Sequence, residues 1–202
     1  MAESNGTNPI PPSSNDDQFT DSRDGQKYKI VKIGNQVWMA ENLDYDHEDS
    51  EYYNDDSSYE KTYGRLYGKK GAMESCPPNW HLPDENAWAT LYNSLGGVRF
   101  SSEVGGKMKS TGTIEERNGL WDSPNTGATN ESRFTALPGG RRSVNLSGST
   151  RYVNIGSRGY FFISTPKDEA SAHFLINSNG FLNDNYNSPS GTRFSVRCVR
   201  DN

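Results

Sequence analysis

The chain is poor in cysteine and histidine and has no long hydrophobic run, and each shortage excludes a class of protein. It contains 2 cysteines and 3 histidines among 202 residues, and the thiols form neither a CxxC pair nor part of a metal-ligand set. No apolar stretch approaches the roughly 20 residues of a transmembrane helix. Met1-Ala2 and the polar residues after them do not make a signal peptide. We interpret this start as one from which an export signal has been removed.

Motifs for catalysis and for phosphate binding are also missing. Nucleophilic catalysis needs a Ser or Cys beside a His and an orienting acid, and none of His47, His81 and His173 lies in a recognisable motif. Gly105-Gly106 is not a glycine-rich phosphate loop after a strand. The net charge is −5, and no basic run is interleaved with aromatic residues, so we expect no nucleic-acid partner. The sequence predicts that the protein is not an enzyme.

Aromatic residues and glycine are abundant, with 4 Trp, 11 Tyr, 8 Phe and 20 Gly, although hydrophobic residues make up only 31% of the chain. Disordered chains are poor in aromatic rings, and each buried ring removes a large area from water. The rings therefore indicate a folded domain with a thin core. Residues 1–20, in contrast, are almost free of apolar side chains and predict a disordered tether. We expect one domain over residues 21–202.

Two elements are predicted in the first half of the domain. Residues 27–33 are β-rich, Gly34-Asn35 gives a turn, and residues 36–40 make a second short strand, so a hairpin is expected. A helix follows Pro83 over residues 84–95, with Asp84 as its N-cap and Gly96-Gly97 at its end.

The second half predicts strands. The run 172–176 is followed by Asn179-Gly180 and Phe181-Leu182, which favours a hairpin in which Phe174 and Ile176 face the core. Residues 194–199 read as one alternating strand. Helix signals early and strand signals late predict an α+β fold.

The acidic stretch 44–60 leaves two interpretations open. Asp44-x-Asp46-x-Glu48 resembles the start of a calcium loop, but the sixth and twelfth positions hold Asp49 and Asp55, where an EF-hand needs Gly and Glu. A solvated acidic loop is favoured, and calcium bound by loops of another geometry remains open. No other cofactor is expected.

A polar run just before the last strand is the best candidate for a binding surface. Between residues 177 and 187 the chain has five asparagines together with Ser178, Asp184 and Tyr186. Such residues dominate adaptable binding loops, although an ordinary polar loop has the same composition. We predict a ligand-binding face from the hairpin 172–186, the loop 187–192 and the segment 145–158. The residues expected to bind are Asn183, Asp184, Asn185, Tyr186 and Arg151.

The two cysteines allow either free buried thiols or one disulfide. A bridge between Cys76 and Cys198 would close a loop of about 120 residues, for which chain entropy predicts about 4–5 kcal/mol of stabilisation. The spacing alone does not decide between the two states.

Seven motifs in order resemble one family, the Fibrobacter succinogenes major paralogous domain of bacterial surface and secreted proteins, over residues 21–201. The motifs are Asp21-Ser-Arg-Asp-Gly-Gln-Lys-Tyr28, Val31-Lys-Ile-Gly-Asn-Gln-Val-Trp-Met-Ala-Glu-Asn-Leu43, Gly64-Arg-Leu-Tyr67, Cys76-Pro-Pro-Asn-Trp-His-Leu-Pro83, Phe134-Thr-Ala-Leu-Pro-Gly-Gly-Arg141, Gly159-Tyr-Phe-Phe-Ile-Ser-Thr165 and Ser195-Val-Arg-Cys-Val-Arg-Asp201. Two positions depart from the family pattern. Ala87 replaces a Glu, so the capping box is lost, and Phe162 stands where Trp is frequent.

The resemblance implies a C-type-lectin-like fold, similar to that of formylglycine-generating enzymes. Such a fold has two helices, short antiparallel strands, long polar loops and paired chain ends. It also implies a bridge between Cys76 and Cys198, which would leave no thiols for a copper-dependent oxidase of the formylglycine type. Trp38, Trp80 and Trp88 lie in the shared motifs, and we expect them in the core.

The function expected from these observations is non-catalytic ligand binding by a secreted or cell-surface bacterial protein. A glycan is the favoured ligand, because rings stack on sugars and amides bond to hydroxyls, and a surface protein is the second. The polar run 177–187 also resembles the region that diversity-generating retroelements vary in proteins of this kind. The alternative is a structural module without a ligand of its own. We expect a monomer.

Overall fold

The computed structural model describes residues 18–97, 101–145, 147–166 and 169–201, without the side chains of 184–187. Most of the predicted tether lies outside these ranges. Its last three residues do not: Gln18–Thr20 form β1, which pairs with β2. The folded part therefore starts before Asp21, because Phe19 packs at the edge of the core against the Trp80 ring, 5.0 Å away between centroids.

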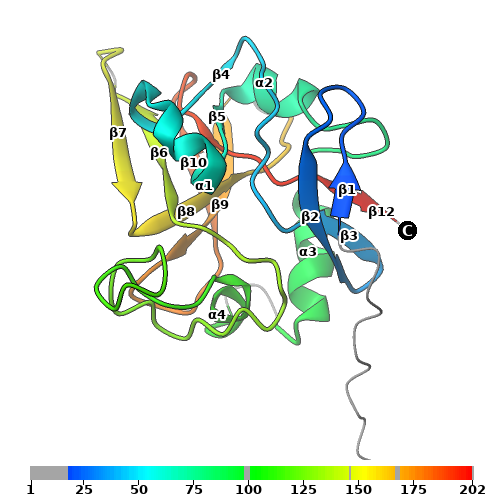
Figure 1. Cartoon of the computed structure of the whole chain (residues 1–202), viewed down its shortest axis with the longest axis vertical. Coiled ribbons are helices and arrows are strands. Elements are labelled where there is room, and N and C mark those ends of the chain that lie inside the picture. Colours follow the sequence, from blue (N-terminus) through cyan, green and yellow to red (C-terminus); the bar gives the residue numbers. More distant parts are fainter. Residues whose placement is uncertain (1–17, 98–100, 146, 167–168, 202) are drawn as a thin grey trace, which may run out of the picture.

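The first sheet has four strands and joins the two ends of the described chain (Figure 1). Its order is β1, β2 (Lys27–Ile33), β3 (Gln36–Met39) and β12 (Val199–Asp201). The predicted hairpin of residues 27–40 is confirmed, with Gly34 in the turn at φ 63°. The final strand pairs with β3, so β1 and β12 lie at opposite edges.

The second sheet is larger and mixed. Its order is β10 (Asn183–Ser188), β9 (Ala170–Ile176), β8 (Arg158–Phe162), β11 (Phe194–Ser195), β5 (Leu66–Tyr67) and β4 (Ser50–Glu51), with β6 (Gly139–Val144) and β7 (Thr150–Ile155) as a hairpin beside β8. Most neighbours are antiparallel, but β8 runs parallel to both β6 and β11. The α+β class is confirmed.

The described residues contain four α-helices, so the expectation of two was wrong. They are α1 (Glu60–Tyr63), α2 (Lys69–Glu74), α3 (Glu85–Ser94) and α4 (Val104–Met108), and two 3₁₀ turns, η1 (Tyr53–Asp55) and η2 (Ser57–Tyr59), precede α1. The three helices that were missed span about one turn each, too short for a periodic pattern. The predicted helix is α3, and its N-cap is confirmed because Asp84 Oδ1 accepts the Ala87 N–H at 2.8 Å.

Apolar side chains cover both faces of the β8–β9 pair. Tyr160 and Phe162 belong to a cluster on one face, and Phe161 and Leu175 belong to a second cluster with α3. The expectation that Phe174 and Ile176 point into the core is confirmed in part. Both are half-buried, and Phe174 packs against the first cluster, whereas Leu175 between them is fully buried in the second cluster on the opposite face. Trp38, Trp80 and Trp88 are all buried, as predicted.

The predicted strand 194–199 is two strands, β11 and β12, in different sheets. Every side chain from Phe194 to Val199 is buried, so the segment crosses the core between the sheets and does not alternate between core and solvent. Arg197 and Cys198 lie on this crossing. In the predicted strand, with one face toward solvent, a buried Arg197 would lack partners for its hydrogen bonds.

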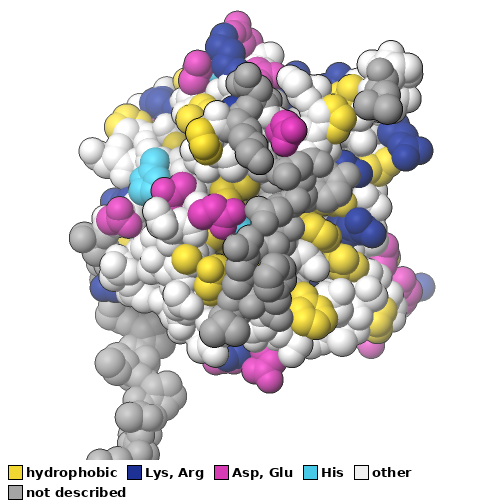
Figure 2. All heavy atoms as spheres, turned by 180° about the vertical axis from the view of Figure 1, so that it is seen from behind, with side chains coloured by type: hydrophobic (Ala, Val, Ile, Leu, Met, Phe, Trp, Pro, Cys, Tyr) yellow, Lys and Arg dark blue, Asp and Glu magenta, His cyan; other side chains and the backbone are white. Residues whose placement is uncertain are grey.

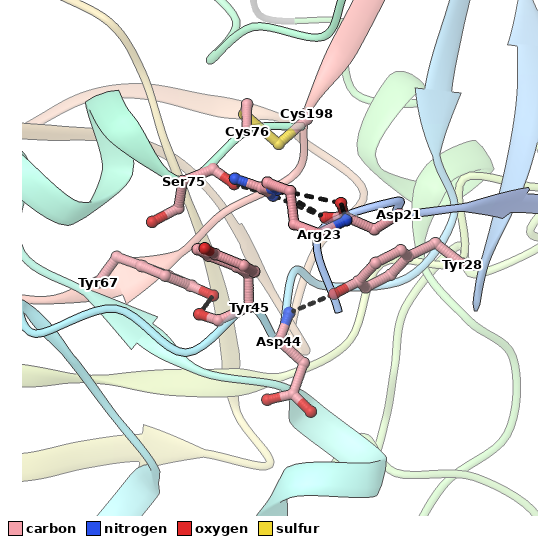
Figure 3. Close-up of a disulfide and its surroundings, with 9 residues drawn as sticks. All are labelled: Asp21, Arg23, Tyr28, Asp44, Tyr45, Tyr67, Ser75, Cys76 and Cys198. Atoms are coloured by element: carbon pink, nitrogen blue, oxygen red, sulfur yellow. Dashed lines mark hydrogen bonds and ion pairs between the residues drawn. A yellow bond between two sulfur atoms is a disulfide. The ribbon is translucent and has the colours of Figure 1, made fainter. Parts of the chain in front are cut away.

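Cys198 forms the disulfide with Cys76 that the family resemblance implied, with Cα atoms 5.8 Å apart. Figure 3 shows the bridge beside the first loop of the domain, where Arg23 bonds Asp21 and donates to the Ser75 carbonyl at 2.7 Å. The Arg23 guanidinium also lies 3.7 Å from the centre of the Tyr45 ring. The bridge thus fixes the crossing segment to the loop that precedes α3.

Replacing both cysteines with alanine should lower the free energy of unfolding by about 3 kcal/mol, since the reduced chain gains loop entropy when it unfolds. Urea denaturation of the variant and of the oxidised parent measures the difference. Intact mass should show two protons fewer in the native protein than after reduction. Two thiols that alkylate readily in protein exported to the periplasm would contradict the bridge.

Candidate ligand-binding cleft

A cleft of about 550 Å³ lies beside the first sheet. One wall comes from β2 and the chain that follows β3, and the others come from α1 and from residues 135–137. The lining residues are Gln26, Lys27, Tyr28, Lys29, Ala40, Glu41, Asn42, Asp44, Glu60, Lys61, Thr62, Gly64, Thr135 and Leu137. A concave site with convergent polar groups is the usual form of a ligand site.

The charges of this lining cancel. Three lysines (Lys27, Lys29 and Lys61) face three acids (Glu41, Asp44 and Glu60). Lys29 and Glu41 pair at 3.4 Å on the rim. Amide, hydroxyl and carboxylate groups between them supply both donors and acceptors. Such a lining suits a neutral ligand with many hydroxyl groups better than a polyanion or a polycation.

Asp44 is the least solvated carboxylate of the cleft, with 13% of its side chain exposed. Its Oδ2 accepts from Gln26 Nε2 at 3.3 Å, and Arg65 Nε lies 3.7 Å from Oδ1, too far for a hydrogen bond. Its backbone N–H donates to the Tyr28 hydroxyl at 3.2 Å, as Figure 3 shows. Burial, with the nearby Glu60 charge, raises the pKa of Asp44 to about 6. Oδ1 is buried and accepts no hydrogen bond within the described residues, so the carboxylate relies on the Gln26 amide and on the Arg65 charge.

This raised pKa gives a stability prediction. The folded state binds the Asp44 proton more tightly than the unfolded chain, so from about pH 4 to pH 6 the free energy of unfolding falls as the pH rises, and the cost is complete above that window. We expect Asp44→Asn to stabilise the fold by about 1–2 kcal/mol at pH 7 and to have little effect at pH 4. Urea denaturation at both values tests this. Asp46→Asn, whose side chain is 83% exposed, is the control and should show no such window.

The structure places the five predicted binding residues on one sheet but does not bring them all together. Asn183 is the first residue of β10, opposite Phe174, and its Nδ2 donates to the Phe174 carbonyl at 3.3 Å. The side chains of Asp184, Asn185 and Tyr186 lie outside the described atoms. The hairpin expected over residues 172–186 is confirmed, because β10 pairs antiparallel with β9 as an edge strand, with a register shift between 183 and 186. The strand continues to Ser188, into the start of the expected loop 187–192.

Arg151, the fifth residue, is exposed on β7 and lines a separate hollow of about 260 Å³ with Asn145 and Ser149. The strand register shows where Arg151 lies relative to Asn183. Phe174 is opposite both Asn183 and Tyr160, and the Arg141 guanidinium lies 5.2 Å from the centre of the Tyr160 ring. Residues 141, 151 and 153 share a face of the β6–β7 hairpin. Asn183 and Arg151 therefore lie on the same face of the sheet, three strands apart.

The acidic stretch 44–60 is not a solvated loop, as had been favoured. It contains β4, η1 and η2, and basic residues distant in sequence pair with its carboxylates. Asp49 pairs with Arg193 at 2.9 Å, and Glu51 pairs with both Arg193 and Arg142 at 3.2 Å. The Tyr152 hydroxyl lies 2.9 Å from a carboxylate oxygen of Glu51 and of Asp55, and its one proton is donated to either of them. Within the described residues no group of His, Cys, Asp and Glu is arranged to hold a metal ion.

Sequence reasoning missed most of the cleft. Its residues come from four segments, 26–29, 40–44, 60–64 and 135–137. Most of them lie in the shared motifs, but only Asp44 and Glu60 belong to a stretch that had been considered as a ligand site. It also missed two buried cations, Lys109 and Arg197, which bond to backbone carbonyls. The one available signal was the position of Arg197 between Val196 and Cys198 in a shared motif, and it does not show which carbonyls are near.

The rest of the described surface has mixed chemistry. Figure 2 shows the face behind that of Figure 1, where acidic and basic side chains are scattered among neutral ones. The large hydrophobic side chains that are exposed, Met73, Ile114 and Phe181, belong to different elements or loops. None of the described helices combines the length and the apolar character that crossing a membrane requires.

Comparison with known proteins identifies the family. A family model, the Fibrobacter succinogenes major domain, matches residues 31–200. No curated protein and no solved structure matches the chain. The matched range contains β3, β12 except Asp201, both cysteines and every lining residue of the cleft from Ala40 onward. The chain belongs to the Fibrobacter succinogenes major domain family.

Proposed function

We propose that this domain is a non-catalytic ligand-binding module and that its ligand is a neutral glycan bound in the cleft. The observation that carries the proposal is the charge-balanced polar lining around the poorly solvated Asp44. A sugar hydroxyl that donates to Oδ2 of Asp44, beside the Gln26 amide, would compensate part of the cost of burying this carboxylate. The same residue would then lower stability in the free protein and raise affinity for the ligand, which is a frequent trade-off at binding sites.

The setting we propose is a secreted or outer-surface bacterial protein, with the domain acting as a monomer. The disulfide supports an oxidising compartment, since such bridges persist there and are rare in the cytosol. The short strands, the pairing of β12 with β3 and the family membership support a C-type-lectin-like fold. A surface protein as ligand and a structural module without a ligand are the alternatives.

A second location for the same function is the sheet face of Asn183 and Arg151, with Asp184, Asn185 and Tyr186 as its other residues. The observation in its favour is that β10 is an edge strand, where sequence changes disturb few neighbours. A region varied by a diversity-generating retroelement would need this tolerance. A ligand here could be a protein, which would contact the wide sheet face and not enter a cleft.

A glycan array followed by calorimetry on the hits tests the function, and two variants separate the locations. Thr62→Trp places a large ring in the cleft from an exposed position on α1. The second variant replaces Asn183, Asp184, Asn185 and Tyr186 with Ala or Ser. We expect the first to abolish binding of the glycan hit and the second to leave both binding and melting temperature nearly unchanged. Loss of binding only in the second would place the site on the sheet, and an array without hits would favour the structural module.

A further inference from the structure

A second hollow of about 280 Å³ adjoins the cleft. The two share Lys29, Ala40 and Thr135 as lining residues, and the second continues along β1 and β2 to Gln18 and Ile30 and along the loop to Asn130 and Arg133. The shared residues form a low barrier. Ala40 contributes only a methyl group, and the Lys29 side chain is 68% exposed on the rim. The two hollows therefore form one groove along β2.

The wall common to both hollows is built around a strained residue. Thr135 is β-branched and yet has φ 55°, and Asn130 and Arg133 in the same loop also have positive φ. A β-branched residue in this region is a genuine outlier that costs of order 1–3 kcal/mol, and such strain concentrates at ligand sites. Because this strain lowers stability, the position of the wall must serve a role other than stabilising the fold.

Two side chains hold the strained wall. Asn130 Oδ1 accepts the Thr135 N–H at 2.9 Å, and Asn130 Nδ2 donates to Thr135 Oγ1 at 3.1 Å. From the core side, Arg197 Nη2 donates to the Thr135 carbonyl at 2.9 Å. The loop is thus fixed before any ligand arrives, and a preformed site avoids the entropy cost of ordering a loop on binding.

From this geometry we infer that the groove takes an internal segment of a linear neutral polysaccharide, with sugar units on both sides of Thr135. The inference rests on the proposed function and adds the form of the ligand. A terminal sugar would need a hollow that is closed at one end. Here the cleft continues past the small Ala40 side chain, so a chain can pass through it.

The test is affinity as a function of chain length. Calorimetry would use cello-, xylo- and manno-oligosaccharides from the disaccharide to the hexasaccharide. For the series that binds, we expect affinity to rise about tenfold once the chain is long enough to pass Thr135, and then to level off. Binding with the same affinity at every length would overturn the inference and leave the proposed function intact. If neither these oligosaccharides nor any array glycan binds, the proposed function itself fails.

Two variants on one strand locate the additional contacts. Gln18 and Thr20 are both exposed on β1, but only Gln18 lines the second hollow. Gln18→Trp should fill that hollow and lower the affinity for the hexasaccharide about tenfold. Thr20→Trp is the matched control and should bind like the parent. Melting temperatures of both should match the parent, which excludes unfolding as the cause. A Gln18→Trp variant that keeps full hexasaccharide affinity overturns the inference.

Discussion

Arg197→Met should destabilise the protein by about 5 kcal/mol, near the upper end of what one substitution does. The guanidinium is fully buried and donates to Asn42 Oδ1, to the Met39 carbonyl and to the carbonyls of Phe134 and Thr135. Each buried acceptor left without a donor costs about 1–3 kcal/mol. Methionine fills a similar volume but restores no hydrogen bond. Urea denaturation at pH 7 measures the loss.

Arg200→Met is the matched control, because Arg200 lies three residues further along the chain, is half-exposed and packs its guanidinium 4.9 Å from the centre of the Trp80 ring. It should cost less than about 1 kcal/mol. Arg197→Lys should fall between the two variants, because an ammonium keeps the charge but has three donors and no planar fork. An Arg197→Met variant as stable as the control would mean that these carbonyls find other partners.

The same substitution should also affect binding. Arg197 is the core-side support of Thr135, which forms the wall shared by the cleft and the second hollow. Under conditions where Arg197→Met remains folded, we expect weaker oligosaccharide binding, because the strained loop loses the bond that fixes it. Arg200→Met should bind normally.

Parts of the fold were predictable because their signals are local. The hairpin of β2 and β3 depends on a Gly-Asn turn between β-rich runs, and α3 depends on Asp84 and on the spacing of Trp88 and Leu91. The split between β11 and β12 was not predictable in this way. A buried strand and a buried crossing have the same apolar pattern, and only the position of the two sheets tells them apart.

The site was harder to predict for a related reason. The acidic stretch was expected to be a solvated loop, yet Arg193, more than 130 residues away in sequence, pairs with Asp49 and Glu51. The polar residues 183–186 were expected in a hairpin, and β9 and β10 do pair, but composition does not show that this strand forms the edge of a larger sheet. The cleft itself is a property of four segments that meet only in the fold.

Lys109→Met should cost about 4 kcal/mol, the second-largest effect we expect. The Lys109 side chain is buried next to the Trp121 ring, and its Nζ donates to the carbonyls of Thr126, Ile176 and Asn179 at 2.8, 3.1 and 2.9 Å. Burial lowers the pKa of Lys109 to about 8, so at pH 7 most of the molecules keep the charge and all three N–H donors. Removing the ammonium takes this donor from three carbonyls in part-buried surroundings, and each lost bond costs about 1–3 kcal/mol.

Lys107→Met supplies the comparison for this prediction, because Lys107 lies on α4, whose C-cap is Lys109, is half-buried, and donates from its side chain to the Leu95 carbonyl at 2.9 Å. It should cost about 1 kcal/mol. The two variants should also differ in where they loosen the protein. Ile176 and Asn179 begin the connection from β9 to β10, so amide hydrogen exchange in β10 should accelerate in Lys109→Met and not in Lys107→Met. If exchange in β10 is unchanged while stability falls, Lys109 supports the core alone, and the edge strand is held by its pairing with β9.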